Sequence, residues 1–269
     1  SFHRDKKRAE EEQQRFAQSV SASMIADDLR KLVEIIGERN PSNETAANNL
    51  TRTAAMIDGL LGPGNTGYVV KRHRGPANWP LLQVTLRGNN PDQPAVWVVT
   101  SYDSRPGSPG VEANATGLAA TLAAAQALAG DTPAVNVHFV FLPHANDPEA
   151  SLLETATKFT ELAATPKAVL CVEAMGASEE LWLSSRNTEA SPLALVDGLG
   201  SVRGAEVVCL GDDVDLASVF FEMGLPAVRV ATRPMVTADV PDNQLPSAAN
   251  VAAAAGRLVK LIRRCAAAP

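Results

Sequence analysis

The sequence is short of the residues that most often bind metals or cross-link a chain. Its 269 residues include only three cysteines and four histidines. The cysteines show no Cys-x-x-Cys or other metal-binding spacing, so no cysteine-based metal site is predicted. Cys171 and Cys209 lie inside apolar runs, which favours two buried thiols, with a disulfide between them as the alternative.

Basic charge and long apolar runs are also lacking, which limits the kinds of partner. The formal net charge is -6, and a general nucleic-acid binder needs a basic surface instead. No apolar stretch approaches the roughly 18 residues that a membrane-spanning helix requires. Hydrophobic residues make up 45% of the chain, enough to bury one sizeable core. A single α/β domain is therefore expected rather than two small ones.

The first residues differ from this globular composition. A basic run at 6–8 precedes an acidic run at 10–12. We expect residues 1–22 to form a charged helical extension or stalk, and residues 23–269 to form the single domain. The chain starts at Ser1 rather than at methionine, so a signal or an anchor can precede it, and a stalk would lead from a membrane tether or from a partner subunit. Such a tether would place the protein outside the cytoplasm.

Hydrophobic periodicity predicts helices and strands that alternate along the chain. Alternation of this kind is typical of a mostly parallel sheet with helices on both faces. The turn at 88–91 separates two strands that we expect to be neighbours in the sheet. The predicted helices are 25–36, 44–61, 116–128, 149–163, 192–199, 216–223 and a last helix capped by Ser247, and the predicted strands are 67–71, 81–86, 95–100, 135–142, 168–172, 206–210 and 227–230.

The stretch from Thr100 to Gly117 contains the most informative motif, Thr-Ser-Tyr-Asp-Ser-Arg-Pro-Gly-Ser-Pro-Gly-Val-Glu-Ala-Asn-Ala-Thr-Gly. It resembles the metal-site loop of the di-zinc aminopeptidase family, which includes bacterial leucyl aminopeptidases, glutaminyl cyclases and the transferrin-receptor ectodomain. The resemblance extends from about Ile25 to Arg264. It implies a zinc-exopeptidase-like fold, a three-layer α/β/α domain with a mixed, mostly parallel central sheet.

The resemblance also implies which positions correspond to the metal ligands of the family. The first histidine ligand falls on Ser101, and the aspartate that supports it is retained as Asp103. The metal-bridging aspartate falls on Ala113, which precedes a retained asparagine, Asn114. The next ligand aspartate falls on Glu173, the one conservative replacement.

Two further positions complete the implied set. The paired glutamates of the family, one a general base and one a ligand, fall on Ala145 and Asn146, or with a slip of one on Asn146 and Asp147. The last histidine ligand falls on Val236, followed by Thr237.

These replacements decide the functional prediction. Two adjacent divalent ions need several carboxylate and imidazole ligands and a bridging group, which hydroxyl, methyl and isopropyl groups cannot supply. A general base replaced by alanine or asparagine cannot take a proton from water. We therefore expect a catalytically inactive zinc-aminopeptidase-like protein without a metal cofactor. Its expected role is that of a structural subunit or a subunit that binds a protein or peptide partner, and not nucleic acid.

The alternative is a rearranged mononuclear zinc site formed by His144, Asp147 and Glu173. It implies an active metal-dependent aminopeptidase or amidohydrolase, and a glutaminyl-cyclase-like transferase would need zinc as well. We otherwise expect His144 to be an ordinary surface histidine and the carboxylates at 212–215 to cap a helix. Ser101 lacks a Gly-x-Ser-x-Gly motif and a histidine partner, so no serine nucleophile is predicted.

Overall fold

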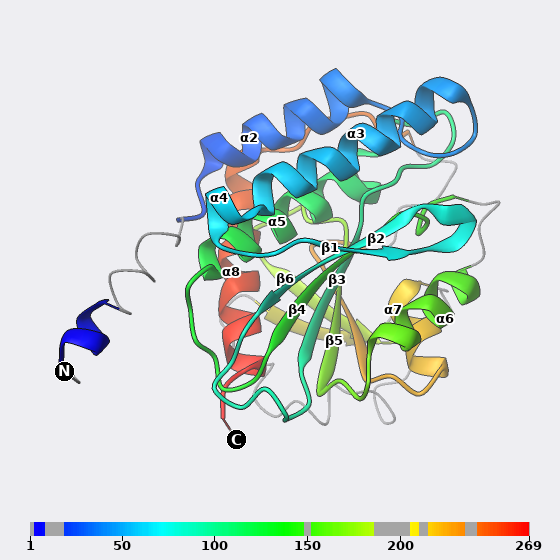
Figure 1. The fold of residues 1–269 in the computed structure, drawn as a ribbon. Coiled ribbons are helices and arrows are strands. Elements are labelled where there is room, and N and C mark those ends of the chain that lie inside the picture. Colours follow the sequence, from blue (N-terminus) through cyan, green and yellow to red (C-terminus); the bar gives the residue numbers. More distant parts are fainter. Residues whose placement is uncertain are drawn as a thin grey trace.

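The computed structural model describes residues 3–8, 19–147, 152–185, 205–209, 215–234 and 241–268. Within these residues, eight strands form one sheet in the order β1-β2-β4-β3-β5-β8-β6-β7 (Figure 1). The strands are β1 (Lys71–Arg74), β2 (Pro80–Leu86), β3 (Val96–Ser101), β4 (Val137–Leu142), β5 (Ala168–Val172), β6 (Leu181–Ser185), β7 (Ala205–Cys209) and β8 (Ala227–Ala231).

The middle of the sheet is parallel. β4, β3, β5 and β8 run in the same direction, so their carboxyl ends meet at one edge. β2 pairs antiparallel with β4 on one side, and β6 pairs antiparallel with β8 on the other. In open α/β sheets, ligands bind at the carboxyl ends of the strands. The parallel middle therefore determines where a site is expected.

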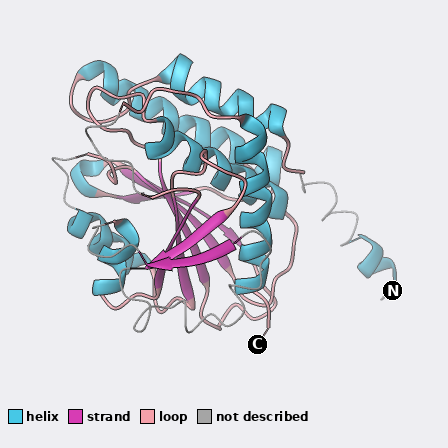
Figure 2. Ribbon diagram, turned by 180° about the vertical axis from the view of Figure 1, so that it is seen from behind, coloured by secondary structure: helices cyan, strands magenta, loops and turns pink. Residues whose placement is uncertain are grey.

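Helices cover both faces of the sheet and confirm the three-layer prediction. α2, α3, α5 and α8 lie on one face, and α6 and α7 lie together on the other (Figures 1 and 2). The helical segments are α2 (Ala22–Arg30), η1 (Lys31–Ile36), α3 (Glu44–Leu61), α4 (Pro63–Thr66), η2 (Pro76–Asn78), η3 (Val111–Ala115), α5 (Thr116–Leu128), α6 (Leu152–Leu162), α7 (Leu216–Glu222) and α8 (Ala248–Cys265).

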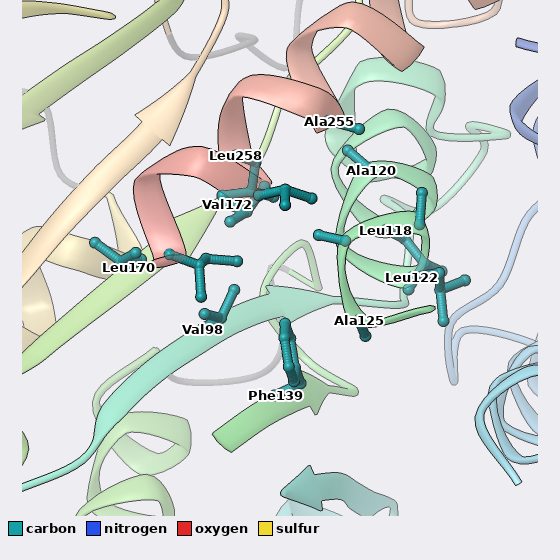
Figure 3. Packing of buried hydrophobic residues seen from close by; sticks show 14 of the residues in the cluster. Val98, Leu118, Ala120, Leu122, Ala125, Phe139, Leu170, Val172, Ala255 and Leu258 are labelled. Atoms are coloured by element: carbon teal, nitrogen blue, oxygen red, sulfur yellow. The ribbon is translucent and has the colours of Figure 1, made fainter. Parts of the chain in front are cut away.

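The larger part of the core lies between the sheet and α5 and α8. Alternate residues of the buried strands, such as Val98, Phe139 and Leu170, face the apolar sides of these two helices (Figure 3). Along α5, almost every residue is buried and six of the thirteen are alanine, which lets the helix pack closely against both the sheet and α8. Burial of this kind stabilises the fold without any contribution from a bound metal.

Several predicted elements are confirmed in their bounds, including α3, α5 and β5. Ser247 caps α8 through a hydrogen bond from the Asn250 N–H, as expected. The strand expected at 67–71 instead begins at Lys71, because the charged edge strand β1 has no apolar run to mark it. β6 was not predicted, and the helix expected at 192–199 lies outside the described residues.

The prediction that β2 and β3 are neighbours is wrong, because β4 lies between them. The turn at 88–91 resembles a hairpin connection in sequence, but its backbone bonds join it elsewhere. The N–H groups of Asn89 and Asn90 donate to the carbonyls of Pro133 and Ala134, just before β4. The turn thus passes over the start of β4 instead of closing a hairpin.

Cys171 and Cys265 are buried free thiols, so the alternative of a Cys171–Cys209 disulfide is wrong. Residues 3–8 are helical and exposed, while the proposed boundary at residue 22 stays a prediction. Among the helices that the structure describes, none is both long and apolar enough to span a bilayer.

Candidate functional site

Strand register brings four side chains to one face of the sheet at its carboxyl edge. Val99 pairs with Cys171, and Cys171 pairs with Arg229. Directly paired residues point to the same face, as do residues two apart along a strand. Ser101 and Glu173 therefore lie on the face of Cys171 and Arg229, which is the face covered by α7.

A small cavity lies at this edge and is partly open to solvent. Three of the sequence-predicted positions line it, namely Ser101, Ala145 and Glu173. The remaining lining residues come from β3, β5, α7 and β8, and they are Thr100, Cys171, Val172, Leu216, Ala217 and Arg229.

The charged part of this cavity is an ion pair between Arg229 and Glu173, formed by the guanidinium Nε and Oε1. The Arg229 side chain is 1% exposed, whereas that of Glu173 is 31% exposed. A second guanidinium nitrogen, Nη1, donates to the Arg233 carbonyl at 2.7 Å. The third, Nη2, is buried without a hydrogen-bond partner among the described residues. The carboxylate at the implied ligand position is thus bound to a protein cation.

The position implied for the bridging carboxylate is apolar. Ala113 is half-buried and packs against Ala174 and Ala231, which are both buried. The neighbouring Asn114 amide donates to Thr100 Oγ1 at 2.9 Å and to the Ser101 carbonyl at 3.1 Å. Asn114 therefore has a structural role, because it fixes the end of β3.

Asp103 and Asn146 connect the loops that follow β3 and β4. The Asp103 carboxylate accepts from the N–H groups of Ala145 and Asn146, at 3.2 and 2.9 Å. The Asn146 side-chain amide donates to Asp103 Oδ1 at 3.2 Å and to Ser101 Oγ at 3.1 Å. An amide N–H therefore points at the hydroxyl in the position implied for the first histidine. An N–H donor offers no lone pair to a metal ion.

Burial raises the pKa of Asp103 to about 7, while the hydrogen bonds from Asn146 and the charge of Arg39 act in the opposite direction. Asp103 is completely buried. Its carboxyl group exchanges a proton close to neutral pH.

Arg39 fixes the loop that contains Asp103. Its guanidinium is fully buried and donates to the carbonyls of Tyr102 at 3.1 Å, Pro109 at 2.6 Å and Gly110 at 3.0 Å. Burial lowers its pKa to about 10, so it stays protonated at neutral pH. These bonds hold the 102–110 loop against the residues that follow η1.

A buried carboxylate, Glu112, lies beside this loop. It is 8% exposed, and neither carboxylate oxygen has a hydrogen-bond partner in the part of the chain that the structure describes. Burial raises the pKa of Glu112, while the nearby Thr116 side chain and the positive charge of Arg233 lower it. The backbone N–H groups of Glu112 and Ala113 donate to the Asp242 carboxylate at 2.8 and 2.9 Å. Asp242 therefore fixes the start of η3.

His144 is not a surface residue, and that prediction is wrong. It is 2% exposed, and Nε2 donates to the Pro76 carbonyl at 2.9 Å. Its Nδ1 lies 3.8 Å from Asp147 Oδ2, so two members of the alternative zinc site are neighbours. Over the described ranges, no three histidine, cysteine, aspartate or glutamate side chains cluster as a metal site would require.

The expected helix cap is confirmed for Asp215, whose carboxylate accepts from the Ser218 N–H at 2.6 Å at the start of α7. Asp212 and Asp213 lie outside the described residues, as does Val236, the position implied for the last histidine.

Sequence reasoning missed Arg229, the residue that changes the interpretation of the site most. Its signal was a lone arginine within the apolar strand Ala227–Ala231. A charge in a buried strand must be paired, because burying it alone costs several kcal/mol. The identity of its partner required the register of β5 with β8.

Comparison with known proteins agrees with the fold. Residues 82–197 match Peptidase family M28. The LapA aminopeptidase of Legionella pneumophila superposes with a TM-score of 0.73 at 13% identity, over 98% of this chain and 75% of that one. A Tannerella forsythia glutaminyl cyclase superposes with a TM-score of 0.70 at 12% identity, over 91% of this chain and 99% of that one. A leucine aminopeptidase precursor from Bacteroides thetaiotaomicron superposes with a TM-score of 0.69 at 10% identity, over 92% of this chain and 98% of that one.

A comparison with curated protein sequences found no match. The chain has the fold of the M28 aminopeptidases, with a mixed α/β domain and a central, mostly parallel sheet.

The residues present do not fit the pair of zinc ions that this fold implies. Ser101 receives an amide N–H, Ala113 packs among alanines, and the Glu173 carboxylate is bound to Arg229. A zinc site requires several deprotonated ligands that converge on one point, which these groups do not provide.

Proposed function

We propose that this chain is a catalytically inactive relative of the M28 aminopeptidases that acts as a structural or protein-binding or peptide-binding subunit. The vestigial metal positions are Ser101, Asp103, Ala113, Asn114, Ala145, Asn146, Asp147, Glu173 and Val236.

The observation that carries this proposal is the ion pair of Arg229 with Glu173. A guanidinium beside the one remaining carboxylate ligand opposes a divalent cation through charge repulsion. It also gives the carboxylate a partner, so Glu173 has no need of a metal. The alanine cluster around Ala113 supports the same interpretation, because it has no lone pairs to bridge two ions.

The rival function is a metal-dependent aminopeptidase or amidohydrolase with a rearranged zinc site. The short distance between His144 and Asp147 favours it, and so do the activities named for the structural relatives. This rival needs zinc, because a metal ion is what would activate the attacking water in it.

Metal analysis of the purified full chain separates the two functions. The inactive protein should contain well under one tightly bound divalent ion per chain after growth in zinc-supplemented medium. It should show no hydrolysis of aminoacyl amides, with or without added zinc. One zinc per chain, together with hydrolysis that a chelator abolishes, would establish the rival instead. The variant His144→Ala then serves as a control, because it should reduce zinc content only if the rearranged site exists.

The partner role has its own experiment. We propose that the charged N-terminal segment contributes to the association, as a stalk would. Deletion of residues 1–20 should therefore weaken any self-association or complex seen by analytical ultracentrifugation. If every association survives the deletion unchanged, the stalk has no such role.

A further inference from the structure

We propose that the outer edge of β1, the side away from β2, binds an extended acidic segment of a partner protein, which adds a strand to the sheet. The inference rests on the proposed function, because it names a surface and a partner chemistry for the binding role. β2 and β4 lie between β1 and β3, the nearest strand that lines the cavity. The surface is therefore separate from the vestigial metal positions.

The hydrogen bonds of the β1–β2 hairpin determine which backbone groups of β1 face outward. The Gly75 N–H donates to the Trp79 carbonyl at 2.8 Å, so these residues form a hydrogen-bonded pair next to the last pair of the ladder. Bonded and non-bonded pairs alternate along an antiparallel ladder. The odd-numbered residues of β1 therefore bond to β2, and the N–H and C=O groups of Arg72 and Arg74 point to the outer edge.

Pro80 agrees with this assignment. It lies opposite Arg74 in the register and has no N–H to donate, as a non-bonded pair allows. Its carbonyl accepts from the Tyr102 hydroxyl at 2.6 Å. Tyr102 follows β3, which lies on the other side of β2 from β1. The polar groups of Pro80 thus point away from β1.

The outer edge is accessible to a further strand. Within the described ranges, β2 is the one strand that pairs with β1. Three of its four residues are exposed, and His73 is half-buried. An exposed strand edge is a template for an added strand, and main-chain hydrogen bonds supply the affinity of such complexes. The edge therefore specifies an extended backbone in the partner.

The side chains of the edge favour an acidic strand. β1 reads Lys-Arg-His-Arg in a chain whose formal net charge is -6. Arg72 forms an ion pair with Asp58 of α3, whereas Arg74 Nε donates to the neutral side chain of Asn78. Lys71 and Arg74 have no acidic partner in the part of the chain that the structure describes. Opposite charges in directly paired strands stabilise the pairing.

Other occupants satisfy the edge less well. A second copy of β1 would place two basic strands side by side, and like charges repel across such an edge. A neutral strand would bond to the backbone and leave the cations unpaired. A nucleic acid would pair with the cations alone, and the net negative charge of the chain opposes it. An extended run of glutamate or aspartate matches both the backbone and the charge.

The test uses the peptide Ac-Val-Glu-Thr-Glu-Glu-Val-NH2, whose glutamates lie opposite Arg74, Arg72 and Lys71 in an antiparallel alignment. The readout is amide hydrogen exchange of the ¹⁵N-labelled full chain, followed by NMR. We expect the peptide to slow exchange of the Arg72 and Arg74 N–H groups saturably, by at least about tenfold. The N–H groups of Lys71 and His73 should change little, because they already bond to β2.

Charge reversal tests the selectivity. Lys71→Glu/Arg74→Glu should weaken binding of the glutamate peptide at least about tenfold and should bind the lysine counterpart, Ac-Val-Lys-Thr-Lys-Lys-Val-NH2, instead. The matched control is Lys260→Glu/Arg264→Glu, which makes the same charge change at two exposed positions of α8. It should leave the affinity within about twofold, because exposed charges far from the edge are screened by salt. Backbone spectra verify that both variants remain folded.

Blocking the peptide backbone tests strand addition itself. N-methyl groups on the first two glutamates remove the N–H groups that would bond to Arg74 and Arg72, so this peptide should not protect the edge. It keeps every charge, so retained binding would mean that the contact is electrostatic alone.

Several results would overturn the inference. They are no saturable protection by the glutamate peptide, equal binding of the lysine peptide by the unmodified chain, or undiminished binding of the N-methylated peptide. Equal protection by single-stranded oligothymidylate would assign the edge to nucleic acid instead. If the Arg72 and Arg74 N–H groups are protected without peptide and lose that protection when residues 1–20 are deleted, the acidic run of the chain itself occupies the edge.

The two proposals can fail separately. A metal-free, inactive chain whose β1 edge ignores the glutamate peptide overturns this inference and leaves the inactive scaffold. A zinc-containing, hydrolytic chain that still binds the peptide along β1 overturns the proposed function alone.

Discussion

The carboxylate of Asp103 accepts hydrogen bonds from both the backbone N–H and the side-chain amide of Asn146, at 2.9 and 3.2 Å. One residue follows β3 and the other follows β4, so the pair joins two loops at the carboxyl edge of the sheet. In the related peptidases, the resemblance implies that these positions supported a histidine and supplied a glutamate. Here they bind each other, and these hydrogen bonds fix the geometry of the two loops.

The buried carboxyl group of Asp103 predicts an unusual pH dependence of stability. Its pKa is about 7 in the folded protein and close to 3.9 in an unfolded chain, so the folded state binds the extra proton between these values. The free energy of unfolding should therefore fall as the pH rises from about 4 to about 7, and level off above that. The contribution is at most about 4 kcal/mol for a shift of about three pKa units.

Urea denaturation between pH 4 and 8 measures this effect. In Asp103→Asn the fall between pH 6 and 7 should be weaker, because no proton is exchanged at this position. Asp28→Asn is the matched control. Burial raises the pKa of Asp28 to about 6, so this residue changes the free energy of unfolding mainly below pH 6 and little between pH 6 and 7. An unchanged slope between pH 6 and 7 in Asp103→Asn would contradict the assignment.

Arg39→Met should destabilise the protein strongly. The carbonyls of Tyr102, Pro109 and Gly110 would each lose a buried donor, so we expect a loss of about 3–5 kcal/mol. Arg52→Met, on the exposed side of α3, should change stability by less than about 0.5 kcal/mol. Urea denaturation of both variants provides the comparison, and equal midpoints would show that the loop does not depend on Arg39.

Two glycine substitutions should have opposite effects. A methyl group on Gly176 would overlap the Glu112 carboxylate and approach the Pro246 ring, so Gly176→Ala should cost about 1–3 kcal/mol. Gly256 lies inside α8 with no atom near its added methyl group, so Gly256→Ala should stabilise by about 0.5–1 kcal/mol. Thermal unfolding checks both signs. A stable Gly176→Ala variant would mean that Glu112 can move away at little cost.

Introducing two ligands of the family should not be enough to produce zinc binding at the proposed vestigial site. In Ser101→His/Ala113→Asp, Arg229 still neutralises Glu173 and repels a divalent cation, by about 4 kcal/mol per unit charge at 4 Å in an effective dielectric of 20. Adding Arg229→Ala should tighten zinc binding at least 100-fold over the double variant, as measured by calorimetry.

Arg52→Ala is the control for this series, because it removes a charge at the exposed surface of α3 instead. Tight zinc binding by the double variant alone would show that Arg229 does not block the site.

The sequence predicted most elements because their signals are local. Apolar spacing marks α3 and α5, and the continuous apolar run marks β5, since each reflects the burial of a face or of a whole strand. The loop from Thr100 to Gly117 indicated where the site lies. Errors arose where pairing is not local: β4 inserts between β2 and β3, and β1 is a charged edge strand.

By itself, then, the sequence determined the fold class and the chemical character of the positions implied for the metals, because a methyl group has no donor atom and a neutral hydroxyl is not among the usual zinc ligands, wherever they lie. The tertiary structure decided which groups surround these positions. The ion pair of Glu173 with Arg229, 56 residues apart, exists because β5 and β8 pair in one register. The burial of His144 likewise depends on the distant Pro76 carbonyl. Such contacts depend on the arrangement of whole strands and loops, which no local pattern encodes.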